Sequence, residues 1–297
     1  MGISCVVIAP SRMPQRPGDA IKTDRRDAEK LAQLHRAGEL TAIYVPTPEL
    51  EALRDLIRAR EDARQDLHRA RQRLIHFLLR HQIHKPEGMK KRWTKRYREW
   101  LSMLKFNNVA QERVFTESLQ QLREVEERIK RLEAAMREEA QICPYAPVIQ
   151  ALQGARGIAL LTAMTLVVEI GNFERFRSPA QLMSYLGLVP REYSSGASTK
   201  RGSLTKVGNS GVRRALVESA WSYRHRPAVK GDLAVRLERA ESIHVHETSW
   251  KAQERLHSKY LKLVRRGKHR NLTMAAVGRE LIGFIWSIAV EAERKMA

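Results

Sequence analysis

Apolar residues recur along two long stretches of the chain at alternating intervals of three and four positions. This spacing is typical of helices that pair along an apolar seam. We expect the two helices to fold back on each other as a long antiparallel coiled coil; pairing between chains, which would make an oligomer, is the alternative. The seam positions are Leu53, Leu56, Arg60, Ala63, Leu67, Ala70, Leu74, Phe77 and His81 in residues 49–82, and Leu122, Val125, Ile129, Leu132 and Met136 in residues 112–140.

The pattern differs on either side of these helices. Residues 3–9 (ISCVVIA) form a continuous β-branched run that predicts a buried strand of the kind found in parallel sheets, and residues 41–45 (TAIYV) predict a second. A short helix is expected between them, from about residue 24 to 36. After Pro144 and Pro147 the helices become shorter and the loops richer in glycine. The predicted fold is therefore mostly α with a partial α/β domain, divided into residues 1–48, 49–143 and 144–297.

The charge balance limits the classes of binding partner that the protein can have. The 54 Lys and Arg residues against 33 Asp and Glu give a net charge of +21, while 43% hydrophobic residues exclude a disordered basic tail. Such a charge favours a nucleic-acid partner, and an unusually basic surface is the alternative. Two cysteines, Cys5 and Cys143, make no disulfide framework, which favours a cytoplasmic protein. The apolar residues 272–290 contain Arg279 and Glu280, so we expect a buried helix and no membrane span.

A basic segment lies between the two long helices, at residues 85–98 (KPEGMKKRWTKRYR). Cations interleaved with Trp93 and Tyr97 suit contact with phosphates combined with base stacking. The alternative is a solvated turn at the end of the coiled coil. The candidate nucleic-acid-binding residues here are Lys90, Lys91, Arg92, Trp93, Lys95 and Arg96.

Residues 22–28 (KTDRRDA) place two acids, Asp24 and Asp27, three positions apart at a helix start. Two carboxylates on one face can hold Mg²⁺, but acids at a helix start also cap it and favour its dipole. From spacing alone we favour capping, since two acids are too few for a two-metal site.

Residues 154–159 (GARGIA) precede an apolar helix and resemble the glycine turn of a helix-hairpin-helix DNA-binding element. Backbone N–H groups in such a turn can meet a phosphate, which makes Arg156 and Gly157 candidate contacts. A plain turn between two helices is the alternative.

Serines beside a glycine occur in residues 187–214 (GLVPREYSSGASTKRGSLTKVGNSGVRR). A serine hydroxyl surrounded by cations can attack a phosphodiester, or it can only donate hydrogen bonds to one, and residue types alone favour the second interpretation. A weaker metal candidate, His244 with His246 and Glu247, is better explained as a solvated loop. The proposed phosphate contacts are Lys200, Arg201, Lys206, Asn209, Arg213 and Arg214.

Taken in order, these motifs resemble the bacterial insertion-sequence transposases of the Piv/DEDD class, the insertion-sequence one-ten family that includes bridge-RNA-guided recombinases. The resemblance also covers EIGNFERF at 169–176, GLVPREYSSG at 187–196 and KVGNSGVRRALVESAW at 206–221. It implies a RuvC-like (RNase H-like) domain with four acids around Mg²⁺, a coiled coil, and a C-terminal serine transposase domain. Asp24 and Asp27 match the third and fourth acids, which reverses the capping preference.

The resemblance further implies that Ser195, directly before the glycine, joins covalently to DNA, with Ser194 as the neighbouring alternative. It implies a structured non-coding RNA partner, and dimers or higher oligomers. The first Asp and the Glu of the family pattern have no counterpart in the chain, so we expect an N-terminally truncated protein with an incomplete Mg²⁺ site and impaired recombination. The alternative function is a non-catalytic DNA- or RNA-binding protein.

Overall fold

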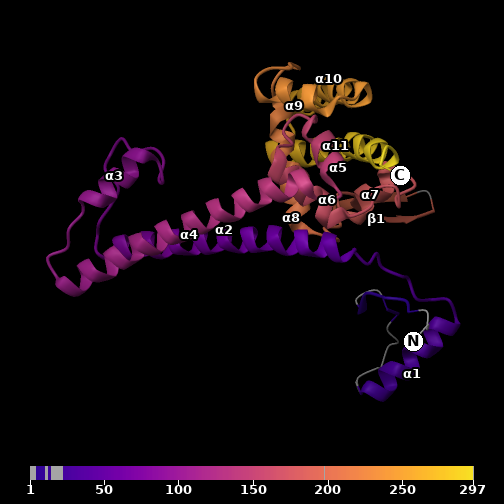
Figure 1. The fold of residues 1–297 in the computed structure, drawn as a ribbon, viewed down its shortest axis with the longest axis horizontal. Helices are drawn as coiled ribbons and strands as arrows, with labels where there is room; N and C mark the ends of the chain where they lie inside the picture. Colours follow the sequence, from indigo (N-terminus) through magenta and orange to yellow (C-terminus); the bar gives the residue numbers. More distant parts are fainter. Residues whose placement is uncertain (1–4, 11–12, 15–22, 197, 297) are drawn as a thin grey trace. The chain divides into compact units, whose positions relative to one another are not determined.

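The chain divides into two compact units, Met1–Pro48 and Glu49–Ala297 (Figure 1). The computed structural model describes residues 5–10, 13–14, 23–196 and 198–296, and only the backbone of Arg201. The predicted coiled coil and C-terminal helices thus belong to one compact unit, and the division of the chain into three domains stays a prediction.

The first unit contains helix α1 (Asp24–Arg36), which confirms the helix predicted there. Its N-cap is Thr23, whose Oγ1 accepts a hydrogen bond from the N–H of Arg26 at 3.4 Å. Asp24 and Asp27 both lie in the first turn, where negative charge favours the helix dipole. The capping residue is therefore Thr23, and the alternative interpretation from spacing alone, that Asp24 caps this helix, is wrong.

The buried parallel strands expected in this unit are not found in its described part. Ile8 and Ala42 form one isolated antiparallel bridge, and the N–H of Ile43 donates to the carbonyl of Val7 at 2.9 Å. Val6 and Val7 are 44% and 45% exposed. Among the described residues no further strand pairs with these segments, so their β-branched side chains have no sheet to be buried in. Residues 3 and 4 of the predicted strand lie outside the described residues.

Two long helices, α2 (Pro48–Arg80) and α4 (Val109–Ile142), run antiparallel and side by side (Figure 1). Ion pairs between the two helices show their register and direction, because the paired residue numbers rise along α2 and fall along α4. We call this helical pair the arm. The pairs are Arg60–Glu133 at 2.6 Å, Asp66–Arg128 at 3.8 Å and Arg71–Glu126 at 3.0 Å.

The seam predicted on α2 is partly confirmed. Leu53 and Leu74 are buried where they were expected, together with Ala63 and Ala70. Ile57 is buried beside the predicted seam, whereas the seam position Arg60 is occupied by a cation that pairs with the opposite helix. The stripe therefore follows the apolar side chains that are available and departs from a strict heptad.

The segment between the two long helices folds onto the arm. It contains helix α3 (Lys95–Met103), which begins after Thr94, whose Oγ1 accepts from the N–H of Tyr97 at 3.3 Å. This packing makes a separate apolar cluster at the α3 end of the arm. The cluster consists of Ala70, Leu74, Leu78, Met89, Tyr97, Leu101, Phe115 and Leu122.

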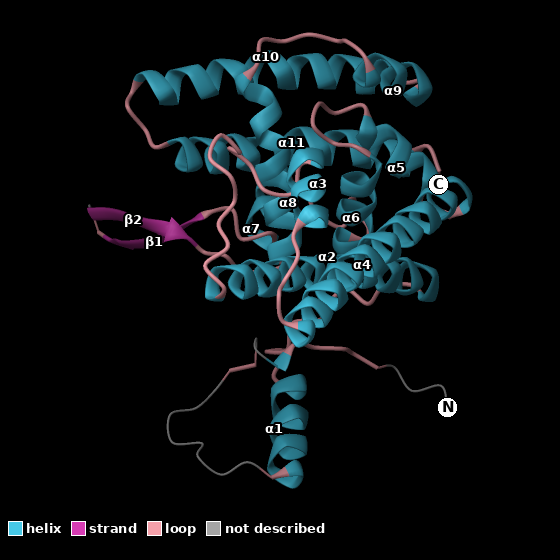
Figure 2. Cartoon of the chain, turned by 90° about the vertical axis from the view of Figure 1, so that its left-hand side faces the viewer, coloured by secondary structure: helices cyan, strands magenta, loops and turns pink. Residues whose placement is uncertain are grey.

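The C-terminal part of the second unit is a set of helices with one β-hairpin (Figure 2). The strands pair antiparallel, and α11 packs against α5, α7, α8 and α10. The elements are α5 (Ala146–Gln153), α6 (Leu160–Ile170), α7 (Pro179–Tyr185), β1 (Pro190–Ser195), β2 (Ser198–Leu204), α8 (Ser210–Ala220), the 3-10 turn η2 (Trp221–Arg224), α9 (Asp232–Ala240), α10 (Ile243–Arg265) and α11 (Arg270–Arg294).

Of the helices in the described part of the chain, α11 alone is long and apolar enough to span a membrane. Just over half of its most apolar window is buried within the fold. Glu280 on this helix pairs with Arg255 and Lys259 of α10. Burial alone would raise the pKa of Glu280, but the two cations hold it below its usual range. These contacts are those of a core helix, as the sequence predicts.

Candidate catalytic hairpin and nucleic-acid interface

The candidate nucleophile Ser195 is exposed at the end of β1, at the tip of the hairpin (Figure 2). It pairs with Ser198 across the strands, and Gly196, with φ +55°, follows it and has open space where a Cβ would lie. Ser194 Oγ donates to Glu192 Oε1 at 2.8 Å. Because successive side chains of a strand face opposite ways, Ser195 projects from the other face, and within the described structure its hydroxyl has no hydrogen-bond partner.

The base of the hairpin is a close crossing of two backbone segments. Gly187 and Gly208 have φ of +65° and +76°. A Cβ on Gly187 would lie 2.2 Å from the carbonyl oxygen of Val207, and one on Gly208 would lie 2.2 Å from that of Tyr185. Only glycine fits such a position without displacing backbone. The glycines of the GLVP and KVGNSG motifs are therefore needed to form the base of the hairpin.

Arg213 holds this base to α8. Its Nη1 donates to the carbonyl oxygens of Val207 at 2.6 Å and Gly208 at 2.9 Å, with a longer contact of 3.3 Å to Leu186. Asn209, the N-cap of α8, accepts from the N–H of Val212 at 3.0 Å. Arg213 and Asn209 thus have structural partners at the base of the hairpin, whereas Ser195 belongs to the last strand pair, next to the tip. Arg213, one of the cations expected around the serine, is therefore used at the base of the hairpin.

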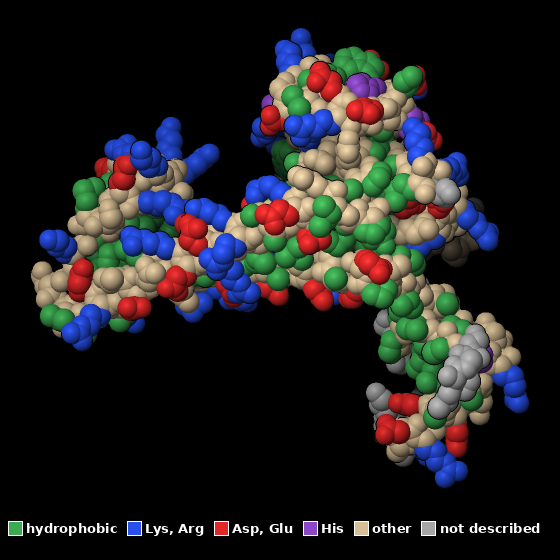
Figure 3. Space-filling view, in the orientation of Figure 1, with side chains coloured by type: hydrophobic (Ala, Val, Ile, Leu, Met, Phe, Trp, Pro, Cys, Tyr) green, Lys and Arg blue, Asp and Glu red, His purple; other side chains and the backbone are tan. Residues whose placement is uncertain are grey.

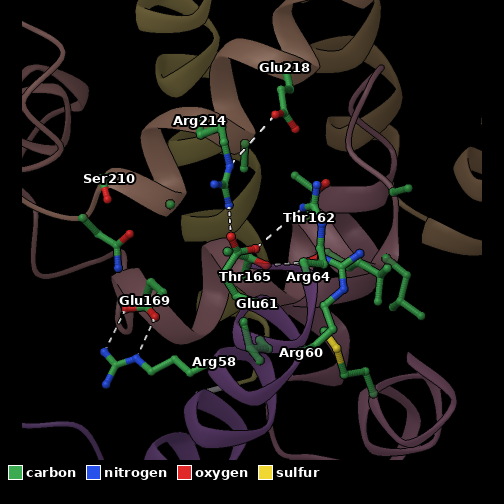
Figure 4. Close-up of a pocket in the computed structure, with 18 of the residues that line it drawn as sticks. Arg58, Arg60, Glu61, Arg64, Thr162, Thr165, Glu169, Ser210, Arg214 and Glu218 are labelled. Atoms are coloured by element: carbon green, nitrogen blue, oxygen red, sulfur yellow. Dashed lines mark hydrogen bonds and ion pairs between the residues drawn. The ribbon is translucent and has the colours of Figure 1, made fainter. Parts of the chain in front are cut away.

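A cavity of about 680 Å³ lies among α2, α4, α6 and α8 (Figure 4). Its walls include Ala159 to Thr162, which follow the RGI turn, and Asn209 to Gly211 at the start of α8. The structure therefore brings together two motifs that lie far apart in the sequence. Neither the helical periodicity nor the glycine turn predicts this meeting.

Ion pairs cross this cavity and join the arm to the C-terminal helices (Figure 4). Arg214 donates to Glu61 of α2 at 2.7 Å and lies 4.0 Å from Glu218. Arg58 lies 3.3 Å from Glu169, a carboxylate that is only 10% exposed. Arg214, predicted as a phosphate contact, is thus already paired with carboxylates.

The turn between α5 and α6 forms as predicted, and its residues take part in packing. Arg156 Nη1 donates to the carbonyl of Arg226 at 2.8 Å and to Gln253 Oε1 at 3.1 Å. Gly157 has φ +84°, and a Cβ there would lie 2.6 Å from the carbonyl oxygen of Ser219. Their role as phosphate contacts stays a prediction.

The two predicted metal ligands do not form a site by themselves. Asp24 is exposed and Asp27 half-buried on the first turn of α1. Across the described residues, no group of three or more His, Cys, Asp and Glu side chains is arranged to hold a metal ion. Two carboxylates on one turn supply fewer oxygen ligands than a tightly bound divalent cation needs.

The basic segment places its cations outside and its aromatic residues inside. Figure 3 shows Lys and Arg side chains gathered at the α3 end of the arm. Tyr97 is 1% exposed, and burial raises the pKa of its hydroxyl. Its expected role in base stacking is therefore wrong. Trp93 is half-buried, with the Arg71 guanidinium 5.0 Å from its ring centre. The exposed candidate contacts are Lys90, Lys91, Arg92, Lys95 and Arg96; Arg98 is also exposed but pairs with Glu126 at 2.7 Å.

On the hairpin and beyond it, Lys200 and Lys206 are exposed, and the side chain of Arg201 lies outside the description. The loop expected at His244 and His246 is wrong, because both lie in the first turn of α10. His244 Nε2 is 3.1 Å from Ser287 Oγ, and His246 Nε2 is 2.9 Å from the carbonyl of Leu237.

Sequence reasoning overlooks two features. Glu293, on α11, accepts hydrogen bonds from the N–H groups of Phe173 and Glu174 at 2.8 to 3.0 Å, and burial raises its pKa. The second overlooked feature is a basic turn between α10 and α11, at residues 265–270 (RRGKHR). The run of cations without acids was the available signal for that turn.

Comparisons with known proteins agree with these motifs. A family model described as "Transposase IS116/IS110/IS902 family" matches residues 149–232, and a second, described as "Transposase" of the DEDD IS110 type, matches residues 1–83. "Putative transposase y4qE" of Sinorhizobium fredii is 44% identical over 99% of this chain and 71% of its own length. "Transposase for insertion sequence element IS1533" of Leptospira borgpetersenii is 32% identical over 89% of this chain and 76% of its own. The chain therefore belongs to the IS116/IS110/IS902 family of insertion-sequence transposases.

Proposed function

We propose that this transposase cuts and rejoins DNA through Ser195. In the proposed step the Ser195 hydroxyl loses its proton as Oγ forms a bond to a DNA phosphorus. The displaced DNA oxygen leaves and takes up a proton. Rejoining reverses the step, because the phosphoserine link retains the bond energy of the phosphodiester. The observation that carries the proposal is the exposed, unpartnered hydroxyl at the tip of a hairpin whose base is held by Arg213.

The family resemblance assigns Asp24 and Asp27 to a RuvC-like domain with four acids around Mg²⁺. The described part of this chain offers these two carboxylates without a third nearby. The described residues therefore do not make up a complete metal site, and we derive no step through a metal. This shortage supports a second candidate function, a protein that binds nucleic acid without recombining it.

The arm and its exposed cations have proposed roles of their own. We propose that α2 and α4 form an antiparallel coiled coil that carries the basic segment, and that Lys90, Lys91, Arg92, Lys95 and Arg96 contact nucleic-acid phosphates. A structured RNA partner is part of the same proposal. So is a dimer or higher oligomer, because two DNA ends must be held together for exchange.

A recombination assay separates the candidates. A plasmid carrying the gene with its natural flanking DNA is scored for excision and joining with the wild type and with Ser195→Ala, Ser194→Ala and Ser198→Ala. Ser198 is a matched control, because it is the cross-strand partner of Ser195. Loss of recombination in Ser195→Ala alone supports the proposal. Loss in Ser194→Ala alone moves the nucleophile by one residue, and binding without recombination in the wild type favours the second candidate.

A further inference from the structure

The turn between α10 and α11 has a defined geometry. Gly267 has φ +68°, and its N–H donates to the carbonyl of Val264 at 2.9 Å. The N–H of Lys268 donates to the carbonyl of Leu263 at 3.2 Å. These two bonds make the Schellman motif that ends many helices. His269 then caps α11, because its Nδ1 accepts from the N–H of Asn271 at 3.3 Å. The turn is thus fixed at both ends by hydrogen bonds.

This turn carries a high density of unpaired positive charge. Its Lys and Arg side chains are all exposed, and none takes part in an ion pair within the described structure. No Asp or Glu occurs between Glu254 and Glu280, and Glu280 already accepts from Arg255 and Lys259. The free cations, which we call the turn cations, are Lys262, Arg265, Arg266, Lys268 and Arg270.

The positions of the turn cations show which of them the stability of the helices can explain and which it cannot. Lys262 and Arg265 lie in the last turn of α10, where cations favour the helix dipole, so folding alone can account for them. Lys268 precedes the N-cap His269, and Arg270 is the first residue of α11, whose first turn contains no acid. A positive charge there opposes the helix dipole. An exposed cation at Arg270 that disfavours its own helix, next to four further unpaired cations, indicates a binding partner of opposite charge.

We propose that the turn cations bind the phosphate backbone of duplex DNA. Each contact between a cation and a phosphate releases condensed counterions, which favours binding whatever the base sequence. Figure 2 draws the turn and the β1–β2 hairpin on the same side of the second unit. The inference rests on the proposed function only in taking DNA as the partner.

A salt titration tests this site. Binding of the full chain to a fluorescein-labelled DNA duplex is measured across salt concentrations for Lys268→Gln/Arg270→Gln. The control is Lys251→Gln/Lys295→Gln, which removes the same charge from exposed lysines already paired with Glu247 and Glu291. We expect the turn variant to reduce the slope of log K against log salt by about two. At about 0.1 M salt its affinity should fall roughly tenfold to hundredfold, and the control should stay within about threefold of the wild type.

Three readouts make the outcome decisive. Equal slopes for the turn variant and the control would overturn the proposal. A turn variant that loses binding to an RNA hairpin of equal phosphate number, but not to the duplex, would overturn the choice of DNA. Thermal melting should show no loss of stability, because removing the cation at Arg270, the first residue of α11, relieves an unfavourable interaction with the helix dipole. Failure of Ser195→Ala to affect recombination concerns the nucleophile and leaves this binding result unchanged.

Discussion

Replacing Arg213 tests whether this side chain holds the hairpin base or contacts DNA. The change Arg213→Met keeps the apolar stem and removes the guanidinium. Three carbonyl oxygens lose a donor, of which Val207 at 2.6 Å and Gly208 at 2.9 Å are close contacts. The third, Leu186 at 3.3 Å, contributes less.

The expected loss of stability in Arg213→Met follows from these contacts. A hydrogen bond from a charged donor contributes about 1.5–3 kcal/mol, and the two close bonds share one nitrogen, so their effects are not additive. Because Arg213 is only half-buried, water can replace part of the loss. We expect Arg213→Met to lower the free energy of unfolding by about 2 kcal/mol.

Urea unfolding measures this loss, and hydrogen exchange locates it. The amides of Thr205 and Lys206 donate to Val189 and Gly187 at the hairpin base, so their protection should fall in Arg213→Met. Arg214→Met is the matched control on the next position, because Arg214 pairs with Glu61 and makes no bond to the hairpin. Unchanged protection together with weakened DNA binding would refute the structural role and return Arg213 to the phosphate contacts.

Three further substitutions have expected outcomes. In urea unfolding, Gly208→Ala should destabilise the second unit by about 3 kcal/mol, because the residue has a left-handed φ and the new Cβ would lie 2.2 Å from the Tyr185 carbonyl oxygen. Gly231→Ala is the control: its φ is also positive, but its Cβ would lie in open space, so it should cost about 1 kcal/mol. Hydrogen bonding to Arg98 holds the pKa of Glu126 below its usual range, so its stabilisation is present above about pH 5 and is lost as the pH falls through the lowered pKa. Glu126→Gln should therefore lose about 1–2 kcal/mol at pH 7, and its difference from the wild type should shrink in acid; a constant difference would contradict the ion pair.

The arm could be predicted from the sequence because its pattern is local. The apolar spacing that includes Leu53 and Leu74 records which side of α2 is buried, and the structure agrees there. The same pattern could not show that Arg60 pairs with Glu133, because that contact depends on the register of two helices distant in sequence. Nor could composition show that Tyr97 turns inward, since a basic segment with aromatic residues fits both a solvated turn and a packed helix.

The candidate site shows the same division. The family resemblance singled out Ser195 within its motif, and the structure places this serine in an exposed position next to Gly196. The cations near it in sequence were expected to surround it, yet Arg213 and Arg214 have partners formed by the tertiary fold. A run of charges identifies a basic segment, but it does not show which guanidinium groups form hydrogen bonds or ion pairs within the protein.

Locating the covalent bond to DNA tests the central claim most directly. The protein is incubated with plasmid DNA carrying its natural flanks, and the denaturant-resistant protein–DNA product is digested with nuclease and trypsin. Cleavage after Arg191 and Lys200 yields the peptide of residues 192–200, which contains Ser194, Ser195 and Ser198. Fragmentation in a mass spectrometer should find the phosphate-linked nucleotide on Ser195. A nucleotide on Ser194 or Ser198, or recombination without any covalent product, would contradict the account.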